Sequence, residues 1–175
     1  MILLVGGARS GKSGTALRLA SASGLPVTFI ATGEAGDEEM AVRIGRHRAE
    51  RPAGWTTIEA PLELYAAVES TDLGRLLIVD CLTLWVSNLL GAGRHSDVVL
   101  SEARRIASLL RERQAVVVSN EVGLGIVPMN ELARRYRDAL GSVNATFSAV
   151  ASRSLLMVAG RALEMSPVDT LLANE

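Results

Sequence analysis

Residues 2–13 read Ile-Leu-Leu-Val-Gly-Gly-Ala-Arg-Ser-Gly-Lys-Ser, so a short aliphatic run leads directly into a glycine-rich turn. The turn, residues 6–13, matches the pattern G-x-x-x-x-G-K-[ST] of a phosphate-binding loop. Glycines let successive backbone N–H groups point inward at a polyphosphate, and a helix that follows adds the positive end of its dipole. The stretch therefore predicts a strand, a loop and a helix that together bind a nucleoside triphosphate.

The loop residues expected to hold the triphosphate are Gly6, Gly7, Ala8, Arg9, Ser10, Gly11, Lys12 and Ser13. Lys12 can reach the β- and γ-phosphates as a compact point charge, and the Ser13 hydroxyl can coordinate Mg²⁺. The chain has 18 Lys and Arg residues, and Lys12 is its one lysine. Ras-like GTPases read guanine with a further lysine in an Asn-Lys-x-Asp motif. The composition therefore argues against a switch-type GTPase.

Composition narrows the class of protein further. The 175 residues are 49% hydrophobic and 21% charged, with a net charge of −1 at pH 7. A charge near zero argues against a broad basic surface for nucleic acid. A single cysteine, Cys81, excludes an intrachain disulfide framework and a cysteine-based zinc site. Without a long uncharged run or a signal-peptide pattern, the expectation is a cytoplasmic protein with no stable membrane insertion.

Aliphatic runs that alternate with helical patterns predict one α/β domain over residues 1–175. We expect strands at 2–5, 26–31, 76–80, 115–119 and 155–159, and a further short strand at 56–59. We expect helices at 15–22, 37–51, 101–113 and 131–152. Because the strands lack polar alternation and are separated by helices, the sheet should be mostly parallel with helices on both faces. We therefore expect a P-loop NTPase type of fold in its RecA-like form.

Asp80 ends the aliphatic run at residues 76–80. In P-loop proteins a carboxylate at the end of such a strand holds the Mg²⁺ of the bound nucleotide, which is the Walker-B role. An Asp at a strand end can also simply cap the next segment. Given the phosphate-binding loop we favour the first role, and Ser13 and Asp80 are the predicted metal ligands.

His47 stands near the end of the second expected helix, among four arginines: Arg43, Arg46, Arg48 and Arg51. The spacing of Arg43, His47 and Arg51 (i, i+4, i+8) places them on one helix face. Cations at the C-terminal end of a helix are favoured by its dipole, and such a cluster can be a solvated surface. It can also be an anion site, in which arginines stabilise phosphoryl charge around a nucleophilic histidine. The residues alone leave both alternatives open.

The order of these features resembles the bifunctional adenosylcobinamide kinase/adenosylcobinamide-phosphate guanylyltransferase family of cobalamin biosynthesis. The resemblance covers nearly the whole chain. It rests on the loop at 6–13, Arg-Ile-Gly-Arg-His-Arg-Ala-Glu-Arg-Pro at 43–52, Trp55, Glu59, Asp-Cys-Leu-Thr at 80–83, and Asn-Glu-Val-Gly-Leu-Gly-Ile-Val-Pro at 120–128. The segments at 43–52 and 120–128 are far more specific than the phosphate-binding loop.

The resemblance implies two reactions. ATP or GTP phosphorylates the aminopropanol hydroxyl of adenosylcobinamide, and GTP then guanylylates a histidine that passes GMP to adenosylcobinamide phosphate. His47 corresponds to that histidine and, with Lys12, is the implied catalytic residue. Further implied nucleotide contacts are Ala31, Thr32, Gly33, Arg48, Ala49, Glu50, Arg51, Glu59 and Asp80. Gly33 departs from the small polar residue usual in the family, which leaves its contact to backbone groups.

The resemblance also implies a homo-oligomer, with a homotrimer as the expected form. The net charge near zero leads us to expect no nucleic-acid partner. Two alternatives are another P-loop small-molecule kinase and a non-catalytic nucleotide-binding module. Neither of them needs His47. Glu121 could position an acceptor or a metal, or could cap a loop, and these roles stay open. Trp55, Trp85 and Cys81 are better explained by packing.

Overall fold

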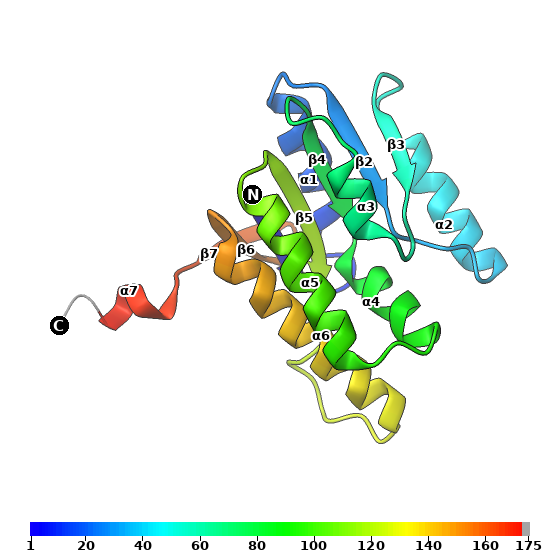
Figure 1. Ribbon diagram of the computed structural model, residues 1–175, viewed down its shortest axis with the longest axis vertical. Helices are drawn as coiled ribbons and strands as arrows, with labels where there is room; N and C mark the ends of the chain where they lie inside the picture. Colours follow the sequence, from blue (N-terminus) through cyan, green and yellow to red (C-terminus); the bar gives the residue numbers. More distant parts are fainter. Residues whose placement is uncertain (173–175) are drawn as a thin grey trace.

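Seven strands form one sheet in the structure, a computed structural model that describes residues 1–172 apart from the side chains of Arg43, Leu171 and Leu172 (Figure 1). The strands are β1 (Ile2–Gly6), β2 (Val27–Ala31), β3 (Thr56–Glu59), β4 (Leu76–Asp80), β5 (Ala115–Asn120), β6 (Arg153–Val158) and β7 (Arg161–Met165). Their order is β3-β2-β4-β5-β1-β6-β7. Neighbouring strands are parallel, except that β6 and β7 form an antiparallel hairpin. The predicted mostly parallel sheet is confirmed.

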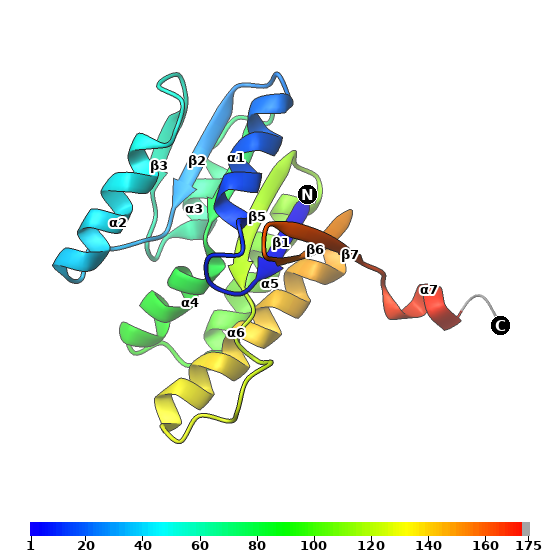
Figure 2. The same cartoon turned by 180° about the vertical axis from the view of Figure 1, so that it is seen from behind.

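Helices cover both faces of the sheet, as Figures 1 and 2 show from opposite sides. They are α1 (Lys12–Ala22), α2 (Glu38–Ala49), α3 (Leu64–Glu69), α4 (Leu82–Gly91), α5 (Ser96–Arg111), α6 (Glu131–Val150) and α7 (Val168–Leu172). α1 packs on one face in an apolar cluster with Phe29 and Ile78. α3 to α6 pack on the other face in a larger cluster that includes Trp85 and Phe147. Among the described residues, no helix combines the length and the apolar character needed to cross a bilayer.

Each central strand is covered on both sides. In β1, Leu3 and Val5 pack into the layer of α3 to α6, while Leu4 packs into the α1 layer. A strand without a solvent face needs apolar residues at every position. This is why the strand-forming segments read as continuous aliphatic runs in the sequence.

The sequence pattern does not predict α3, α4 or β7. α4 buries six of its ten residues, so it has no polar face from which a helical period could be recognised. β7 is exposed along its whole length and has no aliphatic run. It pairs with β6 through a two-residue turn in which Ala159 and Gly160 both have positive φ, 49° and 74°. α5 begins at Ser96 rather than at residue 101, and β6 ends at Val158 rather than at 159.

The carboxyl ends of the parallel strands lie along one edge of the sheet. The register pairs Ala31 with both Glu59 and Asp80. It pairs Gly6 with both Asn120 and residue 157. Ligands of open α/β sheets bind at this edge. The ends of six strands, including the start of the predicted loop and Asp80, are thereby brought to one edge.

Gly6 occupies a position where no side chain fits. A Cβ atom built on Gly6 would lie 2.2 Å from the carbonyl oxygen of Met157 on β6. At that distance the atoms overlap, and the obstacle is a backbone atom that cannot rotate away. The first glycine of the loop is therefore required by the pairing of β1 with β6.

We expect Gly6→Ala to lower the free energy of unfolding by about 2 kcal/mol or more, because overpacking a site that cannot yield costs on the order of 1–3 kcal/mol. Gly7→Ala is the matched control, since a Cβ atom on Gly7 would have no heavy atom within 4 Å. Urea denaturation of the nucleotide-free protein measures both variants. Equal unfolding midpoints for the two would contradict the close approach of β1 and β6.

Candidate nucleotide-binding site at the carboxyl edge of the sheet

The phosphate-binding loop follows β1 and ends where α1 begins, at Lys12. Arg9 and Gly11 have left-handed backbone conformations, with φ of 55° and 93°. Gly11 immediately precedes α1 and offers no side-chain cap, so the first N–H groups of the helix are available to a ligand. The strand, the loop and the helix follow one another as the sequence predicts.

Lys12 is only 6% exposed, and its ammonium lies inside the loop. Nζ donates to the carbonyl oxygens of Gly6 and Gly7, at 2.7 Å each, and to the Ser10 hydroxyl at 3.2 Å. A buried ammonium requires such partners. Phosphate oxygens in the same place would accept stronger, charge-assisted hydrogen bonds. The ammonium is therefore held where a β- or γ-phosphate would need it.

Asp80 stands at the end of β4 and accepts a hydrogen bond from the Ser13 hydroxyl at the start of α1. Burial raises the pKa of the Asp80 carboxyl above its ordinary value. The hydrogen bond from Ser13 lowers this pKa, as do the charges of His47, Arg51 and Lys12. Burial is the largest of these effects, so the ionised carboxylate is under-compensated and would be stabilised by an added cation.

The Ser13 hydroxyl and the Asp80 carboxylate together suit a magnesium ion. Mg²⁺ takes oxygen ligands and is commonly held by one or two protein groups, while waters and substrate phosphates complete its shell. Within residues 1–172, no three His, Cys, Asp or Glu side chains gather closely enough to hold a metal ion by themselves. The donor set fits a cation that is bound jointly with a nucleotide.

A second group of predicted residues meets where α2 ends beside β3. Arg48 forms a hydrogen-bonded ion pair with Glu59. The guanidinium carbon of Arg51 lies 3.7 Å from the centre of the Phe29 ring, and Nη1 donates to the Thr57 hydroxyl at 3.3 Å. The buried Nε of Arg51 has no hydrogen-bond partner among the described residues. Burial also lowers the pKa of Arg51, so this cation would gain from an incoming anion.

His47 is half-buried on α2 and close enough to Asp80 for their charges to interact. Its surroundings include Arg51, whose charge also acts on Asp80. The candidate nucleophile, the phosphate-binding loop and the candidate metal ligand therefore belong to one site. Of the two alternatives for the cluster around His47, this placement favours the anion site.

The remaining residues of this segment lie on the surface of α2. Arg46 lies 3.9 Å from Glu50, one helical turn away, and both are exposed. Ala49 is exposed as well. The side chain of Arg43, expected on the face of His47, lies outside the described residues. Of the predicted arginine cluster, Arg48 and Arg51 contact residues of the sheet, and Arg46 lies on the surface.

Residues 31–33 leave β2 beside the end of β4. Thr32 has no exposed surface, and its hydroxyl bonds the backbone of Cys81. Gly33 is partly exposed, and a Cβ atom on it would lie 3.5 Å from Ile44 of α2. In this turn Gly33 has surface available to a ligand and the Thr32 side chain does not.

Sequence reasoning misses two groups at this edge. The turn of the β6–β7 hairpin reaches the phosphate-binding loop, where the Gly160 N–H donates to the Ser10 carbonyl at 3.1 Å. Asn88 on α4 donates to the carbonyl oxygens of Thr32 and Pro61. The Ala-Gly dipeptide at 159–160 is a weak hairpin signal that could reveal the turn. No sequence pattern distinguishes Asn88.

Glu121 follows β5, and its N–H donates to the Gly6 carbonyl at 3.1 Å. Its carboxylate accepts a hydrogen bond from the Gly123 N–H, which is the loop-capping role among the alternatives considered. Glu121 also borders an apolar cavity of about 320 Å³ against α6, together with Leu124 and Met165. In this conformation the Glu121 carboxylate caps the loop that contains it.

The residues attributed to packing do pack. Trp85 is fully buried, and its indole N–H donates to the Leu62 carbonyl at 3.0 Å. Trp55 packs against the α1-side cluster from its edge. Burial raises the pKa of the Cys81 thiol to about 11, so this sulfur stays protonated and unreactive at neutral pH.

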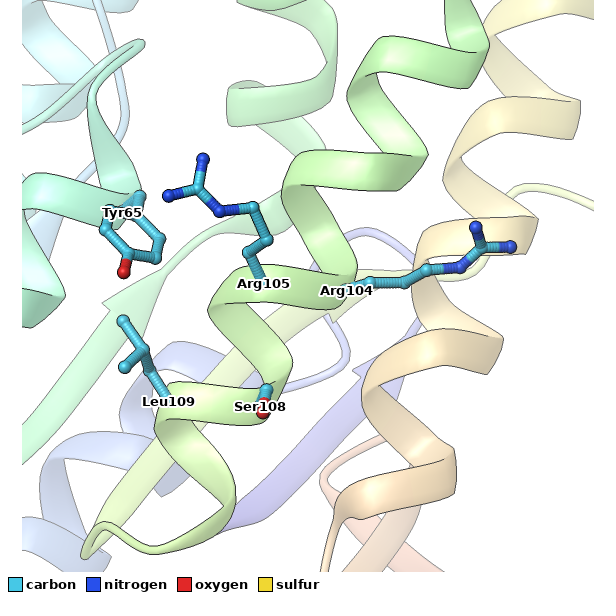
Figure 3. Close-up of a pocket in the computed structure, with 5 residues that line it drawn as sticks. All are labelled: Tyr65, Arg104, Arg105, Ser108 and Leu109. Carbon is cyan, nitrogen blue, oxygen red and sulfur yellow. The ribbon is translucent and has the colours of Figure 1, made fainter.

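A separate concavity of about 390 Å³ lies between α3 and α5, on the face opposite α1. Figure 3 shows Arg105 turned toward Tyr65, with its guanidinium carbon 4.2 Å from the ring centre, while Arg104 points away. The two cations do not converge on a common point. None of the predicted site residues lines this concavity, which therefore does not compete with the carboxyl edge as a phosphate site.

Comparison with known proteins identifies a family and two relatives that match most of the chain. Residues 2–165 match the family described as cobinamide kinase / cobinamide phosphate guanyltransferase. The chain is 48% identical over 161 residues to the bifunctional adenosylcobalamin biosynthesis protein CobP of Pseudomonas aeruginosa, with 90% of this chain and 92% of the relative covered. It is 39% identical over 175 residues to the bifunctional adenosylcobalamin biosynthesis protein CobU of Escherichia coli, with 91% and 96% covered.

Solved structures that resemble this one share its fold at low identity. The assembled ATPase EscN of the enteropathogenic E. coli type III secretion system has a TM-score of 0.58 at 13% identity, and the match covers 90% of this chain and 42% of that one. A Pyrococcus horikoshii protein, PH0250, has a TM-score of 0.54 at 10% identity, with 94% and 84% covered. These likenesses concern the fold alone. From the family match and the two relatives, which cover most of its length, the chain belongs to the cobinamide kinase / cobinamide phosphate guanyltransferase family.

Proposed function

We propose that this chain performs both activities of its family within one domain over residues 1–175. In the first reaction, the γ-phosphoryl group of ATP or GTP passes to the aminopropanol hydroxyl of adenosylcobinamide. In the second, GMP passes from GTP to adenosylcobinamide phosphate, with adenosylcobinamide-GDP and pyrophosphate as products. The supporting observation is that His47 and Lys12 both interact electrostatically with Asp80.

The second reaction is a double displacement at phosphorus, with His47 as the nucleophile. A ring nitrogen of neutral His47 attacks the α-phosphorus of GTP, and the bond to the pyrophosphate oxygen breaks as the P–N bond forms. A phosphate oxygen of adenosylcobinamide phosphate then attacks the same phosphorus, and the P–N bond breaks. The imidazole is restored, and GMP ends on the substrate.

Three cations supply the positive charge that phosphoryl transfer requires. Lys12 stabilises the triphosphate and the departing pyrophosphate. Arg51 is partly desolvated and has an unpaired Nε, which suits it to an anionic ligand. Arg48 is engaged with Glu59, but exposed ion pairs are worth little, so a nucleotide can take over this guanidinium at small cost.

We assign Mg²⁺ to Ser13 and Asp80. When bound there, the ion would neutralise charge on the β- and γ-phosphates. The nucleotide contacts that we propose are those of the loop at 6–13, the turn at 31–33 through Ala31 and Gly33, the segment at 48–51, and Glu59 with Asp80. The Ser13–Asp80 hydrogen bond and the shortage of positive charge around Asp80 support this assignment.

A P-loop kinase of another small molecule and a non-catalytic nucleotide-binding module would share the loop and Asp80. Neither would use His47, which is therefore the residue that separates the three functions. We place the enzyme in the cytoplasm, where ATP and GTP are available. Its proposed ligands are small molecules, and nucleic acid is not among them.

We further propose that the chain is a homo-oligomer, and specifically a homotrimer. Large apolar side chains are exposed in the loop between β5 and α6, with Leu124 85%, Ile126 97% and Met129 97% exposed. A cluster of this kind marks an interaction surface in a folded protein. A second copy of the chain would cover it and remove these side chains from water.

His47→Ala should abolish labelling of the protein by GTP that carries ³²P at the α-phosphorus. The wild-type label should be labile to acid and stable to base, as expected of a phosphorus–nitrogen bond to histidine. His95→Ala is the control, because His95 is the other histidine and is exposed just before α5. Label that survives in His47→Ala would disprove the nucleophile assignment, and mass spectrometry would locate the true site.

Asp80→Asn should stabilise the nucleotide-free protein at pH 7 while it weakens Mg²⁺-dependent GTP binding. The folded state raises the pKa of Asp80, so above this pKa the ionised carboxylate costs stability, and Asn removes the cost. We expect Tm to rise by a few degrees at pH 7, and the difference to vanish below the ordinary pKa of Asp. Exposed Asp72→Asn, followed by the same thermal scans, is the control. A lower Tm for Asp80→Asn at pH 7 would contradict the dominance of burial.

The double variant Ile126→Ser, Met129→Ser should dissociate to monomers, because it removes apolar area from the proposed interface. Light scattering after gel filtration measures the mass, and circular dichroism checks that the variant is folded. Leu73→Ser is the matched control, since Leu73 is 81% exposed on a turn elsewhere. A wild-type monomer, or a double variant that keeps the wild-type mass, would rule out this interface.

A further inference from the structure

Thr32 is bound to the backbone that carries Asp80. Its N–H donates to the Asp80 carbonyl at 3.2 Å, which extends the pairing of β2 with β4 by one residue. Its hydroxyl donates to the Cys81 carbonyl at 2.6 Å and accepts from the Cys81 N–H at 2.7 Å. Three hydrogen bonds from one residue therefore hold residues 80 and 81.

Asn88 holds Thr32 from the other side. Its Nδ2 donates to the Thr32 carbonyl at 2.8 Å and to the Pro61 carbonyl at 3.1 Å. Asn88 lies on α4, whose buried residues include Trp85 and Leu89 in the larger apolar core. The exits of β2 and β3 are thereby attached to a helix that is itself packed in the core.

The Thr32 hydroxyl has no proton left for a phosphate. A hydroxyl carries one proton, and here it goes to the Cys81 carbonyl. The residue is also without exposed surface. A direct side-chain contact with the nucleotide would require these bonds to break and leave buried backbone groups unpaired, which is costly. The hydrogen-bonding groups of Thr32 are thus engaged by neighbouring residues of the protein.

We propose that Thr32 is a positioning residue that sets the Asp80 carboxylate for Mg²⁺ and does not itself contact the nucleotide. This role rests on the assignment of Mg²⁺ to Ser13 and Asp80. Residues that orient a metal ligand without touching the ion typically contribute about 10- to 100-fold in metal affinity. Thr32 has the geometry for this because its bonds hold both polar groups of the Asp80–Cys81 peptide and the carbonyl of Cys81.

The test compares nucleotide affinity with and without Mg²⁺. The probe is a GTP analogue with a methylene group between the α- and β-phosphorus, which cannot transfer GMP to His47, and calorimetry gives its Kd in Mg²⁺ and in EDTA. For Thr32→Val we expect the gain in affinity that Mg²⁺ brings to fall by about tenfold or more, with an unchanged Kd in EDTA. Thr32→Ser keeps the hydroxyl and should keep the wild-type gain.

Thr71→Val is the matched control for burying a valine in place of a threonine. Thr71 is also buried, and its hydroxyl donates to the Ala67 carbonyl within α3, away from the site. Equal losses of affinity in Mg²⁺ and in EDTA for Thr32→Val would mean a direct nucleotide contact or general damage, and would overturn the proposal. A wild-type Mg²⁺ gain in Thr32→Val would overturn it too. Wild-type binding that is indifferent to Mg²⁺ would remove the metal assignment with it, while His47 labelling would still test the transferase activity.

Discussion

The parallel registers of the sheet determine where every group of the site can lie. Ala31 is paired with both Glu59 and Asp80, and Gly6 is paired with Asn120 on the adjacent strand. These pairs align the strand ends. The register alone therefore brings together the phosphate-binding loop, the carboxylate at the end of β4 and the residues that follow β2. The close contact of β1 with β6 at Gly6 then leaves the loop little freedom to shift along the edge.

Two charged side chains at this edge, Asp80 and Arg51, are partly desolvated and would be stabilised by a ligand of opposite charge. Burial disfavours the ionised carboxylate of Asp80 more than its neighbours favour it, and the cation of Arg51 is partly desolvated. The charged form of each side chain is less favourable at this edge than in water, and the Mg²⁺ and phosphate that we propose to bind here would stabilise both. The protein thus gives up some folding stability so that its binding groups are already in place, a common exchange at functional sites. The ammonium of Lys12 differs, since the loop's own oxygens satisfy it.

Much of the fold and of the candidate site could be predicted from the sequence, and the elements that could not be predicted have physical causes. The aliphatic runs and the glycine loop predict the central strands and α1, since their patterns reflect local requirements. α4 was not predictable because a helix buried on most sides has no amphipathic period. The contribution of Asn88 depends on contacts with Thr32 and Pro61, 56 and 27 residues away along the chain, which no local pattern encodes. The residues alone leave the role of His47 open, because no local pattern shows that α2 brings this histidine near Asp80.

The position of β1 between β5 and β6 has a consequence for the order of folding. The first strand of the chain can complete its hydrogen bonding only with β5 and β6, whose residues lie more than a hundred positions later. Contacts of such long range form slowly, because a large loop must close before they repay its entropy. A nascent or partly folded chain therefore carries the phosphate-binding sequence without a formed phosphate site. Nucleotide would recognise the finished fold alone, and so would act as a selective stabiliser of molecules that have folded to the end.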